Sequence, residues 1–70
     1  MFWWYEREGQ YLRVEVLQIA TNEYEFHVIA PDGTETVERY TDAGSLAKRQ
    51  EDLQQTVKRD GWTGPHGWVI

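Results

Sequence analysis

Residues 24–40, YEFHVIAPDGTETVERY, contain two alternating segments separated by a turn, and they decide the fold. Strict alternation of apolar and polar residues over residues 24–28 is typical of a half-buried β-strand. Its apolar face comprises Tyr24, Phe26 and Val28, and its polar face comprises Glu25 and His27. We therefore expect this segment to lie in an antiparallel sheet with one face buried.

The turn that follows fixes how the two segments pair. Pro31 suits the first central position of a type I turn, and Gly33 suits the left-handed position that closes a three-residue loop. Ala30 then lies opposite Thr34. In this register the cross-strand pairs are Glu25 with Arg39 as an ion pair, His27 with Val37, and Tyr24 with Tyr40.

Glu38 is the exception in this hairpin, because the same register places it beside Phe26 on the apolar face. A carboxylate on a buried face is costly unless it has a partner. The second strand of the hairpin is therefore expected to lie at the sheet edge or to carry a bulge.

A second hairpin is predicted at the start of the chain, where residues 2–7 and 11–19 are rich in aromatic and β-branched residues. Glu8-Gly9 forms the tight turn between them. In the resulting register Tyr5 faces Leu12 and Trp3 faces Val14 on one side of the sheet. The other side carries Phe2, Trp4, Glu6, Tyr11, Arg13 and Glu15.

A helix is predicted over residues 43–59. Its apolar stripe follows the i, i+4, i+7, i+11 spacing and consists of Leu46, Gln50, Leu53 and Val57. Thr41-Asp42 offers an N-cap, and Lys58 and Arg59 complement the dipole of the last turn. Gly61 suits the left-handed residue after the helix, which brings Trp62 against Val57.

These elements define an α+β fold: an antiparallel three- to four-stranded sheet made of two hairpins, with one C-terminal amphipathic helix packed on one face. The chain is one domain over residues 1–70, with the sheet in 1–41 and the helix in 42–60. Residues 61–70 are expected to form an irregular apolar tail, because they contain several glycines and a proline.

Composition excludes several classes of function. The 70 residues contain no cysteine, one serine and two histidines, without the spacing of a metal site or of a catalytic triad. We therefore expect no enzyme activity, no cofactor and no metal. The apolar run Met1–Tyr5 is too short to cross a membrane. By default the expected location is cytoplasmic.

The surplus of aromatic residues is the feature that needs a function. Phe2, Trp4 and Tyr11 fall on the sheet face away from the helix, where a contiguous apolar patch is unusual. The tail could cover this patch, two copies could pack face to face, or a different protein or a ligand could bind there. The tail itself, through Trp68 and Ile70, is expected to pack onto apolar surface. The predicted interaction residues are Phe2, Trp4, Tyr11, Arg13, Trp62, Trp68 and Ile70.

Two functions follow from this patch. The first is a non-enzymatic protein–protein interaction module, with another protein or a second copy in a homodimer as the partner. The alternative is single-stranded nucleic-acid binding, by stacking of bases on Phe2, Trp4 and Tyr11 beside Arg13. Charge disfavours the alternative, since the chain carries a formal charge of −5 and residues 1–47 hold nine acidic against three basic groups.

The C-terminal half of the chain also resembles a family. The span from the Pro-Asp-Gly hairpin through the helix to Asp60-Gly61-Trp62-Thr63-Gly64-Pro65 is similar to small uncharacterised bacterial proteins that end in a D-G-W-x-G-P segment. The resemblance implies a bacterial, cytoplasmic, stand-alone domain. It implies no activity.

Overall fold

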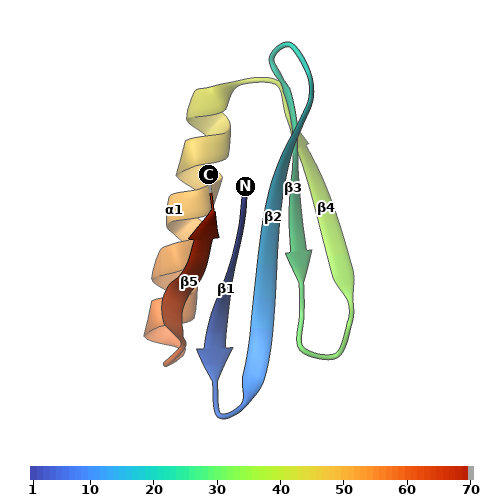
Figure 1. The fold of residues 1–70 in the computed structure, drawn as a ribbon. Coiled ribbons are helices and arrows are strands. Elements are labelled where there is room, and N and C mark those ends of the chain that lie inside the picture. Colours follow the sequence, from blue (N-terminus) through green and yellow to red (C-terminus); the bar gives the residue numbers. More distant parts are fainter. Residues whose placement is uncertain (70) are drawn as a thin grey trace.

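The structure is a computed structural model that describes the backbone of residues 1–69 and the side chains of residues 1–67. One helix lies on one face of a five-stranded antiparallel sheet (Figure 1), which confirms the predicted α+β class. The elements are β1 (Phe2–Arg7), β2 (Gln10–Ala20), β3 (Glu23–Ile29), β4 (Glu35–Tyr40), α1 (Ala43–Arg59) and β5 (Thr63–Val69). The strand order across the sheet is β4-β3-β2-β1-β5.

The β1–β2 hairpin has the predicted register, with Trp3 opposite Val14 and Tyr5 opposite Leu12. Its turn is made by Glu8 and Gly9, whose φ angles of 52° and 79° are both left-handed. Two consecutive residues with positive φ are the signature of a type I′ turn, which matches the twist of the flanking strands. The sequence pattern therefore places both faces of this hairpin correctly.

The β3–β4 hairpin also has the predicted register, from the pair Tyr24–Tyr40 to the pair Ile29–Glu35. Its loop is closed by hydrogen bonds from the Ala30 amide to the Thr34 carbonyl and from the Gly33 amide to the Ala30 carbonyl. β4 lies at the edge of the sheet, which is one of the two arrangements expected from the position of Glu38.

Helix α1 begins and ends where its capping residues predict. The Asp42 carboxylate accepts hydrogen bonds from the amides of Gly44 and Ser45. At the other end, the Trp62 amide donates to the Val57 carbonyl and the Gly61 amide donates to the Lys58 carbonyl. With Gly61 at φ 87°, these two bonds complete a Schellman motif.

The core lies between α1 and the sheet. It is dominated by aromatic and branched side chains from β1, β2, β3 and α1, as expected for a small domain without disulfides. Its buried members are Trp3, Tyr5, Val14, Val16, Phe26, Leu46, Leu53 and Val57. Inside it, the indole Nε1 of Trp3 donates a hydrogen bond of 3.1 Å to the Tyr5 hydroxyl.

The segment expected to be an irregular tail is instead a fifth strand. β5 pairs antiparallel with β1, with Thr63 opposite Glu6, His66 opposite Trp4 and Val69 opposite Phe2. The register shifts twice along this pairing, and the Gly64–Pro65 peptide is cis. The glycines and the proline therefore make the strand irregular without preventing it, because the free edge of β1 supplies the partner.

Candidate functional site

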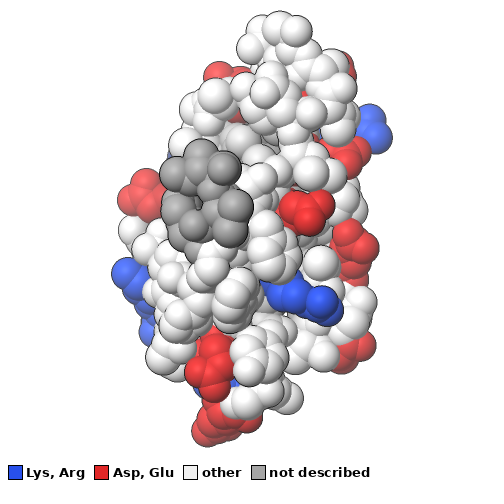
Figure 2. Space-filling view, viewed as in Figure 1, with Lys and Arg blue, Asp and Glu red and all other residues white. Residues whose placement is uncertain are grey.

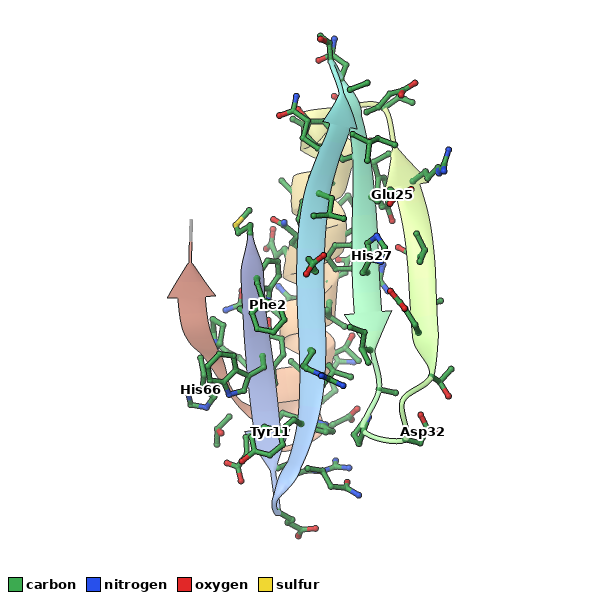
Figure 3. The ribbon with its side chains drawn as sticks, turned by 45° about the vertical axis from the view of Figure 1, so that its right-hand side comes forward. Phe2, Tyr11, Glu25, His27, Asp32 and His66 are labelled. Atoms are coloured by element: carbon green, nitrogen blue, oxygen red, sulfur yellow. The ribbon has the colours of Figure 1, made fainter. Side chains whose placement is uncertain are left out.

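The sheet face opposite α1 is the largest surface that no helix covers, and we call it the open face (Figure 3). In the described part of the chain, the strands present polar and apolar side chains there in alternation. Its apolar members are Phe2, Trp4, Tyr11, Leu17, Ile29 and Val37. Its ionisable members are Glu6, Arg13, Glu15, Glu25, His27, Glu35 and Arg39.

An aromatic cluster occupies the β1 and β5 side of the open face. The ring centroids of Phe2 and Trp4 are 6.1 Å apart, and those of Trp4 and His66 are 6.3 Å apart. The main chain of Gly67 also lies against the Trp4 ring, so closely that a Cβ at this position would overlap it. Trp4 is therefore half-buried, although it projects from the open face.

Tyr11 and Arg13 complete the predicted group on the neighbouring strand. Both side chains are exposed, and Tyr11 retains 52% of its accessible surface. The structure therefore brings four of the predicted interaction residues, Phe2, Trp4, Tyr11 and Arg13, onto one face.

Trp62 lies on the other side of the sheet from that group. It is partly buried against the core, beneath the guanidinium of Arg7, which lies 4.7 Å from the centroid of its ring. The same guanidinium donates a 2.7 Å hydrogen bond to the Asp60 carbonyl at the C-terminus of α1. Trp62 thus joins the helix end to β1. The Trp68 side chain and Ile70, both predicted to pack onto apolar surface, lie outside the described residues.

A charged cluster, which sequence reasoning identified only in part, lies on the β3 and β4 side of the open face. His27 is held between two carboxylates, with Nδ1 2.7 Å from Glu35 Oε1 and Nε2 3.0 Å from Glu25 Oε1. Glu25 also forms the predicted ion pair with Arg39, at 3.1 Å. The sequence pattern places His27 on the polar face of its strand but does not identify its contact with Glu35, although Glu35 is its diagonal neighbour across the hairpin and such neighbours interact.

This arrangement favours the charged imidazolium. Hydrogen bonds accepted by the Glu35 carboxylate and, to a lesser extent, by the Glu25 carboxylate raise the pKa of His27 above its ordinary value of 6.5. Both ring nitrogens face carboxylate oxygens, and only the imidazolium can donate to both at once. The His27 side chain retains 16% of its accessible surface, so water screens these contacts only partly.

On the sheet face that packs against α1, Glu38 is paired with Arg49, a partner that the sequence pattern did not identify. Its carboxylate accepts hydrogen bonds from Arg49 Nε at 2.8 Å and from the Tyr40 hydroxyl at 2.6 Å. Arg49 also lies over the ring of Phe26, 5.4 Å from its centroid. The Arg49 guanidinium and the Tyr40 hydroxyl therefore lower the pKa of Glu38, and the network joins α1 to the edge strand.

The hollows of the described surface are shallow and lie at the ends of the strands. One of them has a volume of about 540 Å³ and is lined by Glu6, Arg7, Glu8, Asp60, Gly61 and Thr63. Its lining residue Thr63 has its hydroxyl oxygen 3.1 Å from His66 Nε2 and 3.5 Å from Glu6 Oε2, and both of these contacts are exposed to solvent. Among residues 1–67, no group of three or more histidine, aspartate or glutamate side chains could hold a metal ion.

Comparison with protein-family models, with curated proteins and with solved structures found no match for the chain. The resemblance of the D-G-W-x-G-P segment to small bacterial proteins therefore stays a prediction. In the part of the chain that the structure describes, no helix has the length and apolar character needed to cross a membrane.

Proposed function

We propose that this protein is a non-enzymatic interaction module whose open face binds another protein. One observation carries the proposal: Tyr11, Leu17 and Val37 retain 52%, 39% and 48% of their accessible surface on a sheet face without a covering layer. A protein interface combines apolar side chains with surrounding polar ones, and the open face offers both on neighbouring strands.

The charge of the open face indicates the chemistry of the partner. The four glutamates Glu6, Glu15, Glu25 and Glu35 outnumber Arg13, Arg39 and the His27 imidazolium by one. Glu25 and Glu35 are already paired with Arg39 and His27, so Glu15 borders the apolar residues without one of these ion pairs. The matching surface therefore carries lysine or arginine side chains next to apolar anchors, because complementary charge selects a partner and speeds its association. A cytoplasmic, bacterial setting belongs to the same proposal.

Single-stranded nucleic acid is the weaker alternative. Stacking needs a free ring face, but Trp4 is already in contact with Phe2, His66 and the main chain of Gly67. Basic groups on the face seen in Figure 2 are separated from one another by acidic and neutral residues, without the continuous stripe that follows a phosphate backbone.

The proposal can be tested by selecting binders from a random-peptide display library with the whole protein as the target. We expect enrichment of peptides that combine lysine or arginine with aromatic or branched apolar residues. Binding of a selected peptide should fall at least about tenfold in Leu17→Ser and Tyr11→Ser, because each variant removes an exposed apolar contact. Ala47→Ser, at an exposed position of α1, is the matched control and should bind as the parent does.

Two results would contradict the proposal. One is enrichment of peptides whose binding is unaffected by both open-face substitutions. The other is retardation of short DNA or RNA oligonucleotides at low salt that disappears in Tyr11→Ser, which would favour the nucleic-acid alternative.

A further inference from the structure

The two edges of the sheet differ in how well they are protected against pairing with another strand. β5 contains Gly64, Pro65 and Gly67, and its pairing with β1 has two register shifts. Proline and bulges are devices by which proteins block an edge. β4 has neither, since all of its residues from Glu35 to Tyr40 pair with β3 in an unbroken register. In Figures 1 and 3 no described element lies beyond β4.

The closing pair of the hairpin determines which main-chain groups of β4 face outward. The Ala30 amide donates to the Thr34 carbonyl, so these two residues form a hydrogen-bonded pair. Because hydrogen-bonded and non-hydrogen-bonded pairs alternate along an antiparallel ladder, the even-numbered residues of β4 bond to β3. The N–H and C=O groups of Glu35, Val37 and Arg39 therefore point to the free edge.

We propose that β4 pairs with β4 of a second copy of this chain, antiparallel, about a twofold axis at Val37. In this register Val37 lies opposite Val37 of the second copy, and Glu35 lies opposite Arg39 of the second copy. Each outward-facing residue then belongs to a hydrogen-bonded pair, which exchanges both of its N–H···O bonds. The twofold axis repeats the Glu35–Arg39 pairing, so the edge is complementary to itself.

The side chains of Glu35 and Arg39 are exposed enough, and have enough unused hydrogen-bonding atoms, to form these intermolecular ion pairs. Arg39 keeps 74% of its side-chain surface and uses one nitrogen for Glu25, whereas Glu35 keeps 49% and uses one oxygen for His27. Opposite charges placed across paired strands stabilise the pairing, and like charges destabilise it. A shift of the register by two residues would place Val37 opposite a charged residue and would lose both ion pairs. The charges therefore select a single register.

The paired chains would form one continuous sheet with both helices on the same side. The two open faces would then merge into one surface of twice the width. Val37 and Glu35 belong to both proposals, but this inference does not rest on the proposed function, because it is argued from the outward-facing main-chain groups of β4 and its test does not involve Tyr11 or Leu17.

The contact is small, since six-residue strands bury less than the ~1,200 Å² of a standard interface, so we expect a dissociation constant in the micromolar-to-millimolar range. Sedimentation equilibrium of the parent chain over that range of concentration should show a mass that rises toward twice the 8.3 kDa of one chain. A parent chain that stays monomeric throughout would overturn the proposal.

Charge reversal tests the register. Glu35→Arg places two arginines opposite each other in a homodimer, and Arg39→Glu places two glutamates there, so each variant alone should be monomeric. An equimolar mixture of the two should form a heterodimer, because both pairs then join Arg to Glu. If each variant dimerises as the parent does, or if the mixture stays monomeric while both variants keep the parent's circular dichroism spectrum, the register is wrong.

A second pair of variants separates loss of pairing from loss of folding. Val37→Pro removes an amide that faces the free edge, a position at which a strand tolerates proline, so the chain should fold and remain monomeric. Val37→Thr keeps the amide and the strand preference, so it should dimerise. Dimerisation of folded Val37→Pro would place the contact elsewhere on the molecule, and this result decides the question even if a charge variant fails to fold.

Discussion

The main chain of Gly67 lies against the indole ring of Trp4, and this contact packs β5 against a side chain of the strand with which it pairs, β1. Gly67 has a φ of 64°, so both its backbone conformation and the space beside it require glycine.

Gly67→Ala should therefore lower the melting temperature, because the added Cβ displaces either the Trp4 ring or the strand. Gly33→Ala is the matched control. Gly33 also has a left-handed φ, of 90°, but has open space around it, so this variant measures only the backbone penalty of about 1–2 kcal/mol. Equal destabilisation of the two variants in urea would contradict the close packing of β5.

Leu53 is the centre of the buried stripe of α1, with 8% of its surface accessible. Leu53→Ala should lower the free energy of unfolding by about 2–5 kcal/mol, because it removes buried methyl groups and leaves a cavity under the sheet. Gln55→Ala, at an exposed position of the same helix, should change it by less than about 0.5 kcal/mol. Urea denaturation followed by circular dichroism at 222 nm measures both.

Gln50 belongs to the same stripe, and its side-chain Nε2 is buried without a hydrogen-bond partner in the protein. An unsatisfied buried donor costs about 1–3 kcal/mol. Gln50→Leu removes this donor and keeps a side chain of comparable length, so we expect the variant to be more stable by about 1 kcal/mol. A lower urea midpoint than that of the parent would show that the amide contributes to packing.

The stability of the protein should depend on pH near neutrality through His27. Because Glu35 and Glu25 raise the pKa of His27 in the folded state, the folded protein binds this proton more tightly than the unfolded chain. The resulting stabilisation is complete below the unfolded value of about 6.5 and is lost as the pH rises through the folded value. In His27→Gln the fall in stability over this window should disappear. An NMR titration of the His27 ring that gives an ordinary pKa would contradict the prediction.

Glu38 contributes to stability with the opposite dependence on pH. The Arg49 guanidinium and the Tyr40 hydroxyl lower the pKa of Glu38, so its contribution to stability is present above about pH 4.5 and is lost as the pH falls through the folded value. Glu38→Gln should lower the free energy of unfolding by about 1 kcal/mol at pH 7. This is less than the loss of a fully buried charged hydrogen bond, because the Arg49 and Glu38 side chains are both about one-third exposed and water screens the pair. The difference from the parent should shrink in acid. A constant difference from pH 7 to pH 3 would show that the carboxylate charge is unimportant.

The sequence predicts two hairpins and one helix because each is specified locally. Glu8-Gly9 and Pro31–Gly33 contain the turn residues that set the strand registers, and Asp42 and Gly61 set the helix ends. The alternation of side chains then places Phe2, Trp4, Tyr11 and Arg13 on one face without knowledge of the three-dimensional structure. What these residues bind stays a prediction.

Long-range contacts account for what sequence reasoning missed. Residues 63–69 lack the alternation of a strand, and they form one because β1 has a free edge on that side. Likewise Glu38 is acceptable on a buried face only because Arg49, from the following helix, reaches it. Neither partner can be identified from the local pattern of residues.

The pairing of β1 with β5 also has a consequence for the order of folding. Strands β1 to β4 form a meander in which each strand pairs with its neighbour in sequence, whereas joining Phe2 to Val69 closes almost the whole chain into a loop. The entropy of such a closure favours its formation after the local hairpins. We expect β5 to dock after the rate-limiting step, so Gly67→Ala should accelerate unfolding and leave the folding rate nearly unchanged in stopped-flow measurements. A matching fall in the folding rate would place β5 in the folding nucleus.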